Sequence, residues 1–349
     1  MKIEKRNFGT LSAGEAVHVY IMKNGAGMEV HLLDFGAIVH RVFAPDQEGR
    51  LRDVVLGHPS IEGYEGGRGF FGGFIGRYAN RIKGAAFELD GKRYEVLKNN
   101  GENFLHGTFH KKLYEVELLE DGICFFRVSP DGEDGFPGNL STRATFRLTE
   151  DNRLLVDYCA ETDAPTVVNF TCHSYFNLDG QDSGPVLQQN LAIAAESFLP
   201  PGEDPCPTGE LALVEGTPMD FRESHAIGDR ITDPYVVASG NGYDHCYVLD
   251  KTVPWAAKAY SERSGIGLTI QTTQVGMQLY TGNFIGGITG KDGAAYEKHS
   301  GFALEPQAFP CSPNYPHFPS TVLRPGEVYS QSICYSFDVM SEEKMNNAL

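Results

Sequence analysis

Hydrophobic and polar residues alternate with a period of two along most of the chain. The segments FELDGKRYEV (87–96) and YEVELLEDGICFFRV (114–128) each contain two such runs, separated by Asp90-Gly91 and by Asp121-Gly122. Asp-Gly is typical of the tight turn of a β-hairpin, because both residues tolerate positive φ angles. No long segment has the 3.6-residue period of an amphipathic helix. The pattern therefore predicts an all-β protein.

The spacing of the expected strands indicates the architecture. Strands recur at roughly ten-residue intervals, without strand–helix–strand alternation and without a fixed-period repeat. This arrangement is typical of a large antiparallel sandwich or barrel. No linker or charge run divides the chain, and the segment 200–233, rich in Pro, Gly, Asp and Glu, is interpreted as a long connection. We expect a single domain over residues 1–349.

Charge and composition restrict the partners. The formal net charge of −17 disfavours nucleic acids and anionic membranes, which bind through Lys and Arg patches, and favours a neutral small molecule. The N-terminal residues lack a signal-peptide pattern and no window reaches the length of a membrane span, so we expect a cytoplasmic protein. The seven scattered cysteines favour reduced thiols over a disulfide framework or a zinc site. The choice between monomer and homodimer stays open.

The segment NFTCHSYFNL (169–178) is predicted to be a strand with two different faces. Hydrophobic side chains occupy one face, namely Val168, Phe170, Cys172, Phe176 and Leu178. The other face carries hydrogen-bonding groups, namely Asn169, Thr171, His173, Tyr175 and Asn177. A solvent-facing strand more often carries Lys, Glu and Arg than such a row. We therefore interpret the face around His173 as ligand-binding; the alternative is a buried core histidine.

A carboxylate occupies a similar place in HSGFALEPQAF (299–309). Phe302 and Leu304 share one face of the expected strand, and Glu305 lies on the other. Taken alone, Glu305 is equally well explained as an edge-strand side chain in water. If it faces the same cleft as His173, the two form a base and an acid that titrate around neutral pH.

Two further segments offer polar groups. In TTQVGMQLYTGNF (272–284), Gln278 lies on an uncharged polar face, and an amide both donates and accepts hydrogen bonds, as sugar hydroxyls require. The alternative for Gln278 is a cross-strand amide ladder. In NGYDHCYVL (241–249), Asp244 precedes a hydrophobic run, and its alternative is a turn-forming role.

The glycine-dense segment GGRGFFGGFIGRYANRI (66–82) contains a literal G-x-G-x-x-G at Gly67, Gly69 and Gly72. No strand precedes it and no helix follows, so we do not interpret it as a dinucleotide site. Glycine here is expected to let the backbone pass close to another group, with Asn80 and Arg81 as polar anchors. The alternative for Arg81 is a structural salt bridge.

The segment NNGENFLHGTFH (99–110) places His106 and His110 four residues apart. Gly107 and the Asn-rich residues before it argue against the helix that a metal-binding pair would need, and no third ligand is evident nearby. We expect no metal, and interpret His106 as a ligand contact or a local cap. With no nucleophilic Ser or Cys pattern, planar polar side chains and aromatic rings together indicate a sugar site.

Eight segments, taken in order, resemble the aldose 1-epimerases (galactose mutarotases). They extend from Gly76 to Glu327 and are GRYANRI, NFLHG, DGFPGNL, HSYFNL, GYDH, QLYTGNF, LEPQAFPCSPNYPHFP and LRPGE. The resemblance implies a large antiparallel β-sandwich of the galactose-mutarotase type. It also implies that the protein interconverts the α and β anomers of a free aldose, such as galactose or glucose, through the open-chain aldehyde, without a cofactor or a metal.

The resemblance also implies roles for individual residues. His173 matches the general acid that protonates the ring oxygen, and Glu305 matches the general base that takes the proton from the C1 hydroxyl. The positions that match substrate contacts are Asn80, Arg81, His106, Tyr175, Asp244 and Gln278. Departures from the family pattern occur at Thr108, Cys172 and Pro306, and they bear on substrate preference more than on activity.

Three other functions remain open at the level of sequence. A hexose-6-phosphate 1-epimerase of similar fold needs a cluster of basic residues, and only Arg81 lies in the matched site segments. A glycosidase would use Glu305 and Asp244 as its carboxylate pair. A non-catalytic sugar-binding protein would keep the polar contacts but would have no need of His173 together with Glu305. The preferred sugar, whether galactose, glucose or a pentose, also stays open.

Overall fold

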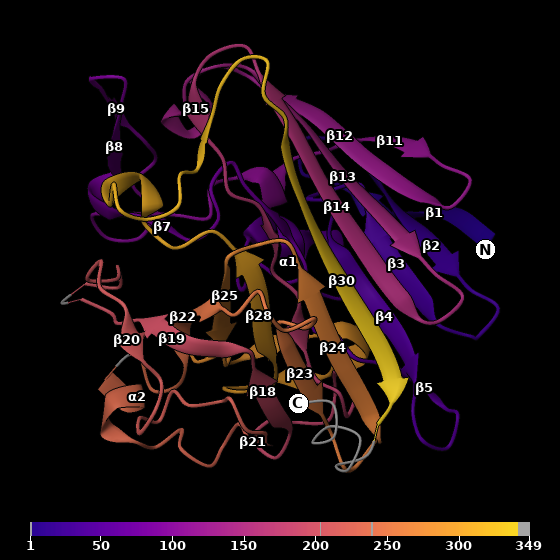
Figure 1. Cartoon of the computed structure of the whole chain (residues 1–349). Coiled ribbons are helices and arrows are strands. Elements are labelled where there is room, and N and C mark those ends of the chain that lie inside the picture. The colour runs from indigo at the N-terminus through magenta and orange to yellow at the C-terminus, as the bar shows by residue number, and fades with distance from the viewer. Residues whose placement is uncertain (1, 203, 239, 341–349) are drawn as a thin grey trace.

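Antiparallel sheets make up most of the structure, a computed structural model that describes residues 2–202, 204–238 and 240–340 (Figure 1). The largest sheet contains, in spatial order, β11 (Glu115–Leu118), β12 (Gly122–Ser129), β13 (Leu140–Leu148), β14 (Arg153–Thr162), β30 (Tyr329–Val339), β24 (Ile266–Thr272), β23 (Ala257–Tyr260), β18 (Asn190–Ile193) and β21 (His225–Ala226). Of these, β30 is long and pairs antiparallel with β14 on one side and with β24 on the other. The all-β prediction is confirmed.

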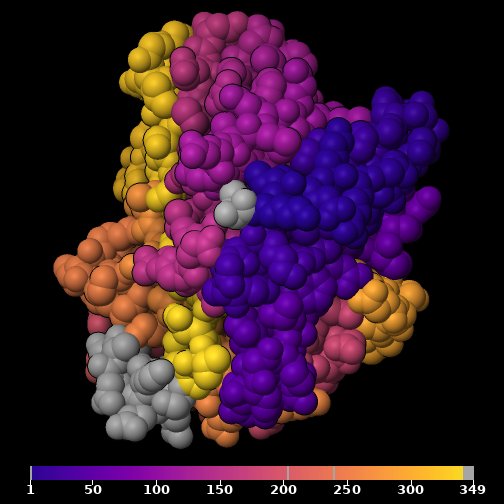
Figure 2. Space-filling view, turned by 90° about the vertical axis from the view of Figure 1, so that its right-hand side faces the viewer, coloured from indigo at the N-terminus to yellow at the C-terminus, as the bar shows by residue number. Residues whose placement is uncertain are grey.

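A second sheet consists of the N-terminal strands β1 (Lys2–Thr10), β2 (Ala16–Lys23), β3 (Glu29–Leu33), β4 (Val39–Pro45) and β5 (Leu51–Asp53). It lies behind the largest sheet in Figure 1, and these indigo strands cover much of the face seen in Figure 2. Tyr20 of β2 and Phe125 of β12 meet between the two sheets, with ring centroids 6.0 Å apart. The two sheets therefore form the layers of a sandwich.

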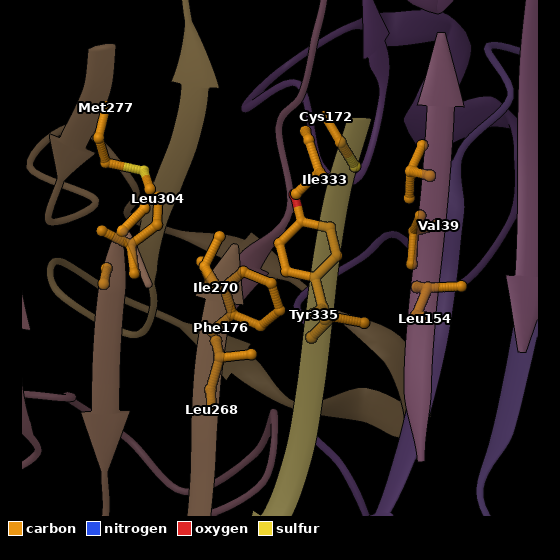
Figure 3. Packing of buried hydrophobic residues seen from close by; sticks show 14 of the residues in the cluster. Val39, Leu154, Cys172, Phe176, Leu268, Ile270, Met277, Leu304, Ile333 and Tyr335 are labelled. Atoms are coloured by element: carbon orange, nitrogen blue, oxygen red, sulfur yellow. The ribbon is translucent and has the colours of Figure 1, made fainter. Parts of the chain in front are cut away.

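The third sheet contains β17 (Tyr175–Phe176), β28 (Phe302–Gln307), β25 (Gly276–Tyr280), β22 (Asp244–Leu249), β19 (Ala195–Leu199) and β20 (Ala212–Leu213). Its inner side joins the same hydrophobic core, in which Phe176, Ile270 and Tyr335 point toward one another (Figure 3). The rings of Phe176 and Tyr335 are 5.5 Å apart. The core fixes which side of β28 and β25 is left for polar groups, because successive side chains alternate across a strand.

The remaining elements are short. Two-stranded ladders are formed by β7 (Arg81–Ile82) with β10 (Phe104–Leu105), β6 (Phe74–Ile75) with β16 (Thr171–Cys172), β8 (Ala86–Leu89) with β9 (Lys92–Glu95), β15 (Thr166–Val167) with β29 (Val322–Leu323), and β26 (Ile288–Thr289) with β27 (Ala295–Tyr296). The helices are α1 (Ile61–Gly66), α2 (Pro234–Ala238) and the 3₁₀ turns η1 (Lys83–Ala85), η2 (Phe109–Lys111), η3 (Glu133–Gly135), η4 (Lys291–Gly293) and η5 (Ser312–Asn314). No helix in the described ranges is long and hydrophobic enough to span a membrane.

Both predicted hairpins form, but only one has the predicted turn. Asp90 and Gly91 connect β8 to β9 with φ angles of 52° and 76°, as the Asp-Gly pattern predicts. The prediction for Asp121-Gly122 is wrong, because Gly122 already belongs to β12 and pairs with Arg147. A Cβ atom at Gly122 would come 2.4 Å from the carbonyl oxygen of Phe146, so this glycine allows close strand contact and does not form the turn.

The prediction of one continuous strand over 169–178 is also wrong. The segment forms two short strands, β16 and β17, with His173 in the gap between them. The chain changes partner at this gap, since β16 pairs with β6 and β17 pairs with β28. The predicted hydrophobic face is nevertheless confirmed, as its five members are all in the main core, namely Val168, Phe170, Cys172, Phe176 and Leu178.

Candidate active site

A pocket of about 230 Å³ lies between the third sheet and the β7–β10 ladder. All eight residues predicted as catalytic or substrate-contact residues line it, namely Asn80, Arg81, His106, His173, Tyr175, Asp244, Gln278 and Glu305. The remaining lining residues are Arg68, Gly69, Phe70, Asn100, Leu105, Tyr280, Phe284, Ile285 and Ile288. Its volume suits a single sugar ring with several hydrogen-bonding groups around it.

Four adjacent strands of the third sheet supply one wall of the pocket. Gln278 of β25 lies directly across from Glu305 of β28, and Asp244 of β22 lies across from Tyr280. Neighbouring strands are roughly 4.8 Å apart, so these side chains form a compact row although they are distant in sequence. The period of two aims them all at the pocket, since their neighbours Leu279 and Leu304 point into the core.

His173 is held by its backbone at the gap between β16 and β17. Its N–H donates to the carbonyl oxygen of Gly73 (3.0 Å), and its carbonyl accepts from the N–H of Gly72 (2.9 Å). The imidazole is buried, and no other residue of the described ranges makes a hydrogen bond to Nδ1. Burial lowers the pKa of His173 to about 4, because the interior disfavours the charged imidazolium.

Glu305 faces His173 across a short gap. Its Oε1 atom lies 3.6 Å from Nε2 of His173, which is longer than a hydrogen bond, and its Oε2 atom has no partner among the described residues. Burial raises the pKa of Glu305 well above its usual range, the Asp244 carboxylate raises it further, and Arg81 partly offsets both. Both groups are therefore driven toward their neutral forms, in which the pair holds one proton.

Arg81 is fixed between an amide and a carboxylate. Its Nε atom donates to Oδ1 of Asn100 (3.1 Å), and its Nη2 atom lies 3.9 Å from Asp244. Gln278 donates in turn from Nε2 to Oδ1 of Asp244 (2.6 Å). These contacts link four side chains in a row, Asn100, Arg81, Asp244 and Gln278. The row presents donors and acceptors side by side, which suits neighbouring hydroxyl groups of a sugar.

His106 is a hydrogen-bond donor to the pocket. It has a positive φ of 61°, and its Nδ1 atom accepts the backbone N–H of Asn80 (3.1 Å). A neutral imidazole that accepts at Nδ1 carries its proton on Nε2. Burial, reinforced by His173, Arg81 and His110, lowers the pKa of His106 well below its usual value, so the ring stays neutral.

This tautomer bears on metal binding. His106, His173 and Glu305 place one ligand atom each within 4.8 Å of one another, a spacing that would suit a metal ion. A metal at His106 would need the unprotonated Nε2, and the hydrogen bond from Asn80 favours the opposite tautomer. The residues present therefore fit a sugar better than a metal.

Of the five polar residues predicted on the face of 169–178, only His173 and Tyr175 reach the pocket. Asn169 donates to the carbonyl of Ala79 and accepts from the N–H of Ala308, and Asn177 donates to the carbonyls of Gly184 and Ser300. These two amides join backbone segments. Alternation shows which side a residue faces, but the break at His173 turns the ends of this face away from the pocket.

Several pocket residues are not among the eight predicted site residues. Tyr280 lies on the same face of β25 as Gln278, so the alternation contained a signal for it. Phe70 and Asn100 lie in irregular segments, where no period indicates orientation. Phe284 is 72% exposed at the pocket, and nothing in its local sequence marks it.

Comparison with known proteins identifies the family. The family model "Aldose 1-epimerase" matches residues 18–336. The chain belongs to the aldose 1-epimerase family. Among curated relatives, bovine galactose mutarotase is 40% identical over 345 residues, covering 97% of this chain and 99% of that protein. The aldose 1-epimerase of Escherichia coli is 37% identical over 335 residues, covering 93% and 96%.

Solved structures of aldose 1-epimerase relatives share the fold. An aldose epimerase homologue from C. elegans superposes with a TM-score of 0.86 at 32% identity, covering 93% of this chain and 100% of that one. Galactose 1-epimerase from Lactobacillus acidophilus superposes with a TM-score of 0.85 at 26% identity, covering 97% and 99%. The predicted antiparallel β-sandwich of the galactose-mutarotase type is confirmed.

One departure from the usual epimerase pattern has a local partner. Thr108 donates its hydroxyl and its backbone N–H to the carboxylate of Asp134, at 2.9–3.1 Å. A Cβ atom at the adjacent Gly107 would come 2.5 Å from the carbonyl of Gly76. The loop after His106 is therefore anchored through Thr108, and neither Thr108 nor Asp134 lines the pocket.

Proposed function

We propose that this chain acts as a single-domain aldose 1-epimerase on free hexoses, with galactose and glucose as substrates. The observation that carries the proposal is the pair His173 and Glu305, two buried groups 3.6 Å apart in a pocket large enough for one pyranose. Such a pair can remove one proton and deliver another without a nucleophile. The relatives named galactose mutarotase and aldose 1-epimerase support the same reaction.

In this proposal Glu305 takes the proton of the C1 hydroxyl while His173 protonates the ring oxygen. The bond between C1 and the ring oxygen breaks, and C1 becomes the carbonyl carbon of the open-chain aldose. Rotation about C1–C2 presents the other face of the carbonyl. The reverse proton transfers then close the ring as the other anomer, and both residues return to their starting states.

The environment of the pair suits the opening step. Before it, Glu305 is a carboxylate and His173 an imidazolium; after it, both are neutral. Burial favours the neutral form of each group, as the raised pKa of Glu305 and the lowered pKa of His173 indicate. The same burial destabilises the starting ion pair, which the attraction across 3.6 Å and hydrogen bonds from the sugar must offset.

The other six predicted residues are proposed as substrate contacts. Asp244 forms an ion pair with Arg81 (3.9 Å) and accepts a hydrogen bond from Gln278, and this row can engage adjacent hydroxyls. His106 offers its Nε2–H as a donor, and the ring of Tyr175 packs 4.8 Å from that of His173. The Oδ1 atom of Asn80 accepts the backbone N–H of Arg81 (2.9 Å), which holds the amide of Asn80 at the pocket. A cytoplasmic location fits the proposal, because the seven cysteines are free thiols.

The test is the rate at which freshly dissolved α-D-galactose and α-D-glucose reach anomeric equilibrium, followed by polarimetry or by coupled detection of the β anomer. We expect strong acceleration over buffer for both sugars. Folded protein, checked by circular dichroism, that gives no acceleration would overturn the proposal. α-D-Glucose 6-phosphate and a chromogenic galactoside are run in parallel. Preference for the phosphate would favour the sugar-phosphate alternative, and release of the chromophore would favour a glycosidase.

A further inference from the structure

The glycine-dense loop Gly67–Gly73 wraps around His173. Gly67, Gly69 and Gly72 have φ angles of 69°, 84° and 66°, a region that glycine enters without strain. A Cβ atom at Gly72 would come 2.1 Å from the carbonyl oxygen of Val39. The same loop supplies both backbone hydrogen bonds of His173, through Gly72 and Gly73. The loop is thus fastened to the backbone of His173 itself, at both its N–H and its carbonyl.

Phe70, in the middle of this loop, also has a positive φ of 56°. A bulky residue rarely adopts this conformation, which is less stable than the right-handed one by roughly 1–2 kcal/mol. The strained conformation turns the ring toward three imidazoles. It stacks on His173 (centroids 5.6 Å apart, planes at 21°) and meets His106 and His110 edge to face, at 4.9 Å each.

Packing has to orient the imidazole of His173. No other described residue makes a hydrogen bond to Nδ1, and the ring's own polar contact is with the backbone of His173 itself, so the surrounding packing has a large part in setting its rotation. The 3.6 Å gap to Glu305 is too long for a hydrogen bond to do so. Among the aromatic rings around the His173 imidazole, those of Phe70 and Tyr175 lie most nearly parallel to it, with planes inclined by 21° and 30°.

We propose that Phe70 is a positioning residue for the epimerase reaction: its ring, held by the Gly67–Gly73 loop, orients the His173 imidazole so that Nε2 faces Glu305 and the sugar. This inference rests on the proposed function. It gives the glycines a specific task, because three left-handed glycines let the loop turn a phenylalanine back onto the residue to which the loop is hydrogen-bonded.

The principal variant is Phe70→Leu, which keeps a hydrophobic side chain but removes the flat ring. We expect kcat to fall about tenfold or more, because small errors in the orientation of a catalytic group are costly. KM should change less than kcat. Phe70→Tyr keeps the ring and should therefore keep kcat near the wild-type value. Phe70→Met is the second variant if Phe70→Leu does not fold.

The pH profile and an NMR measurement separate positioning from a general loss of structure. In Phe70→Leu, water should reach the imidazole of His173 and reverse part of the lowering of its pKa by burial. The acidic limb of the kcat/KM profile should therefore move to higher pH. The titratable and charged groups that line the pocket or lie beside His173 are Glu305, Asp244, His106, His110, Tyr175, Tyr280, Arg81 and Arg68, and the substitution leaves all of them in place. The imidazole protons of His173 should also shift, because they lose the ring current of Phe70.

The matched control is Phe87 and not Phe71 of the same loop, because Phe71 packs against Tyr175, a proposed substrate contact. Phe87 is a buried phenylalanine that packs against Tyr94 and Phe136 in a separate hydrophobic cluster, and none of the three lines the pocket. Phe87→Leu should lower the melting temperature while kcat and the acidic limb stay near wild type. If Phe70→Leu behaves in the same way while the wild type is active, the inference is wrong and the proposed function stands. If the wild type does not accelerate mutarotation, the proposed function itself fails.

Discussion

Replacement of Glu305 by Gln tests catalysis and burial in one variant. Gln has nearly the same shape, and β28 can keep its pairing with β17 and β25. It cannot accept the C1 proton, so we expect kcat to fall by roughly 10²–10⁴-fold, which corresponds to about 3–5 kcal/mol of barrier. At the same time the protein should become more stable, since a buried carboxyl with a raised pKa is replaced by a neutral amide.

The gain in stability should depend on pH in a defined way. Below pH 4.5, the ordinary pKa of the group, the carboxyl is protonated in both the folded and the unfolded chain and its ionisation has no effect. Above it, the unfolded chain releases the proton while the folded chain retains it, so wild-type stability falls by up to about 1.4 kcal/mol per pH unit until the folded pKa is reached. The advantage of Glu305→Gln should therefore widen as pH rises through this window.

The assays are mutarotation of α-D-galactose and denaturant unfolding at several pH values. A kcat within a few-fold of wild type would refute the base assignment. An advantage that stays constant from pH 5 upward would refute the claim that burial raises the pKa of Glu305. Glu297, which is exposed and does not line the pocket, is the control position, and Glu297→Gln should change neither quantity.

Four further outcomes are expected. His173→Ala should lose most of its kcat with the fold retained by circular dichroism, and near-normal turnover would exclude His173 as the acid. The kcat/KM profile of the wild type should fall below about pH 4, because the pair of His173 and Glu305 gains a second proton there and loses its base. It should fall again above the raised pKa of Glu305, because the last proton leaves the pair and no acid remains. A maximum confined to pH 8 or above would contradict this profile. Asn100→Ala frees Nε of Arg81 and should raise KM about tenfold with a smaller change in kcat, whereas an unchanged KM would show that Arg81 needs no support. Arg77→Leu should lose at least about 3 kcal/mol in denaturant unfolding, because the buried guanidinium donates to the carbonyls of residues 129, 130, 137 and 138; a loss below about 1 kcal/mol would show that water replaces it.

Much of the local structure could be predicted from the sequence. The turn at Asp90-Gly91 depends on two residues and their φ angles, and it forms as expected. The hydrophobic face from Val168 to Leu178 depends only on a period of two, and its members are all buried in the main core. The period of two does not, however, predict where the chain changes from one partner strand to another. Nothing between residues 169 and 178 indicates that the chain leaves β6 after Cys172 and joins β28 at Tyr175.

The candidate site divides in the same way. Chemical type and strand face single out His173, Glu305 and Gln278 as polar groups on inward faces, and the motif order adds the family. Phe70 and Asn100 were missed because they lie in irregular loops, where orientation follows from contacts with distant residues.

The sequence by itself determined the period of the strands, the composition of their two faces and the identity of the two groups proposed to react. The tertiary structure decided that β28 lies between β17 and β25, that Nε2 of His173 stands 3.6 Å from Glu305, and that both groups are removed from water. The physical reason is that a strand's period is a property of consecutive residues, whereas a proton affinity depends on which distant groups surround a side chain and exclude solvent from it.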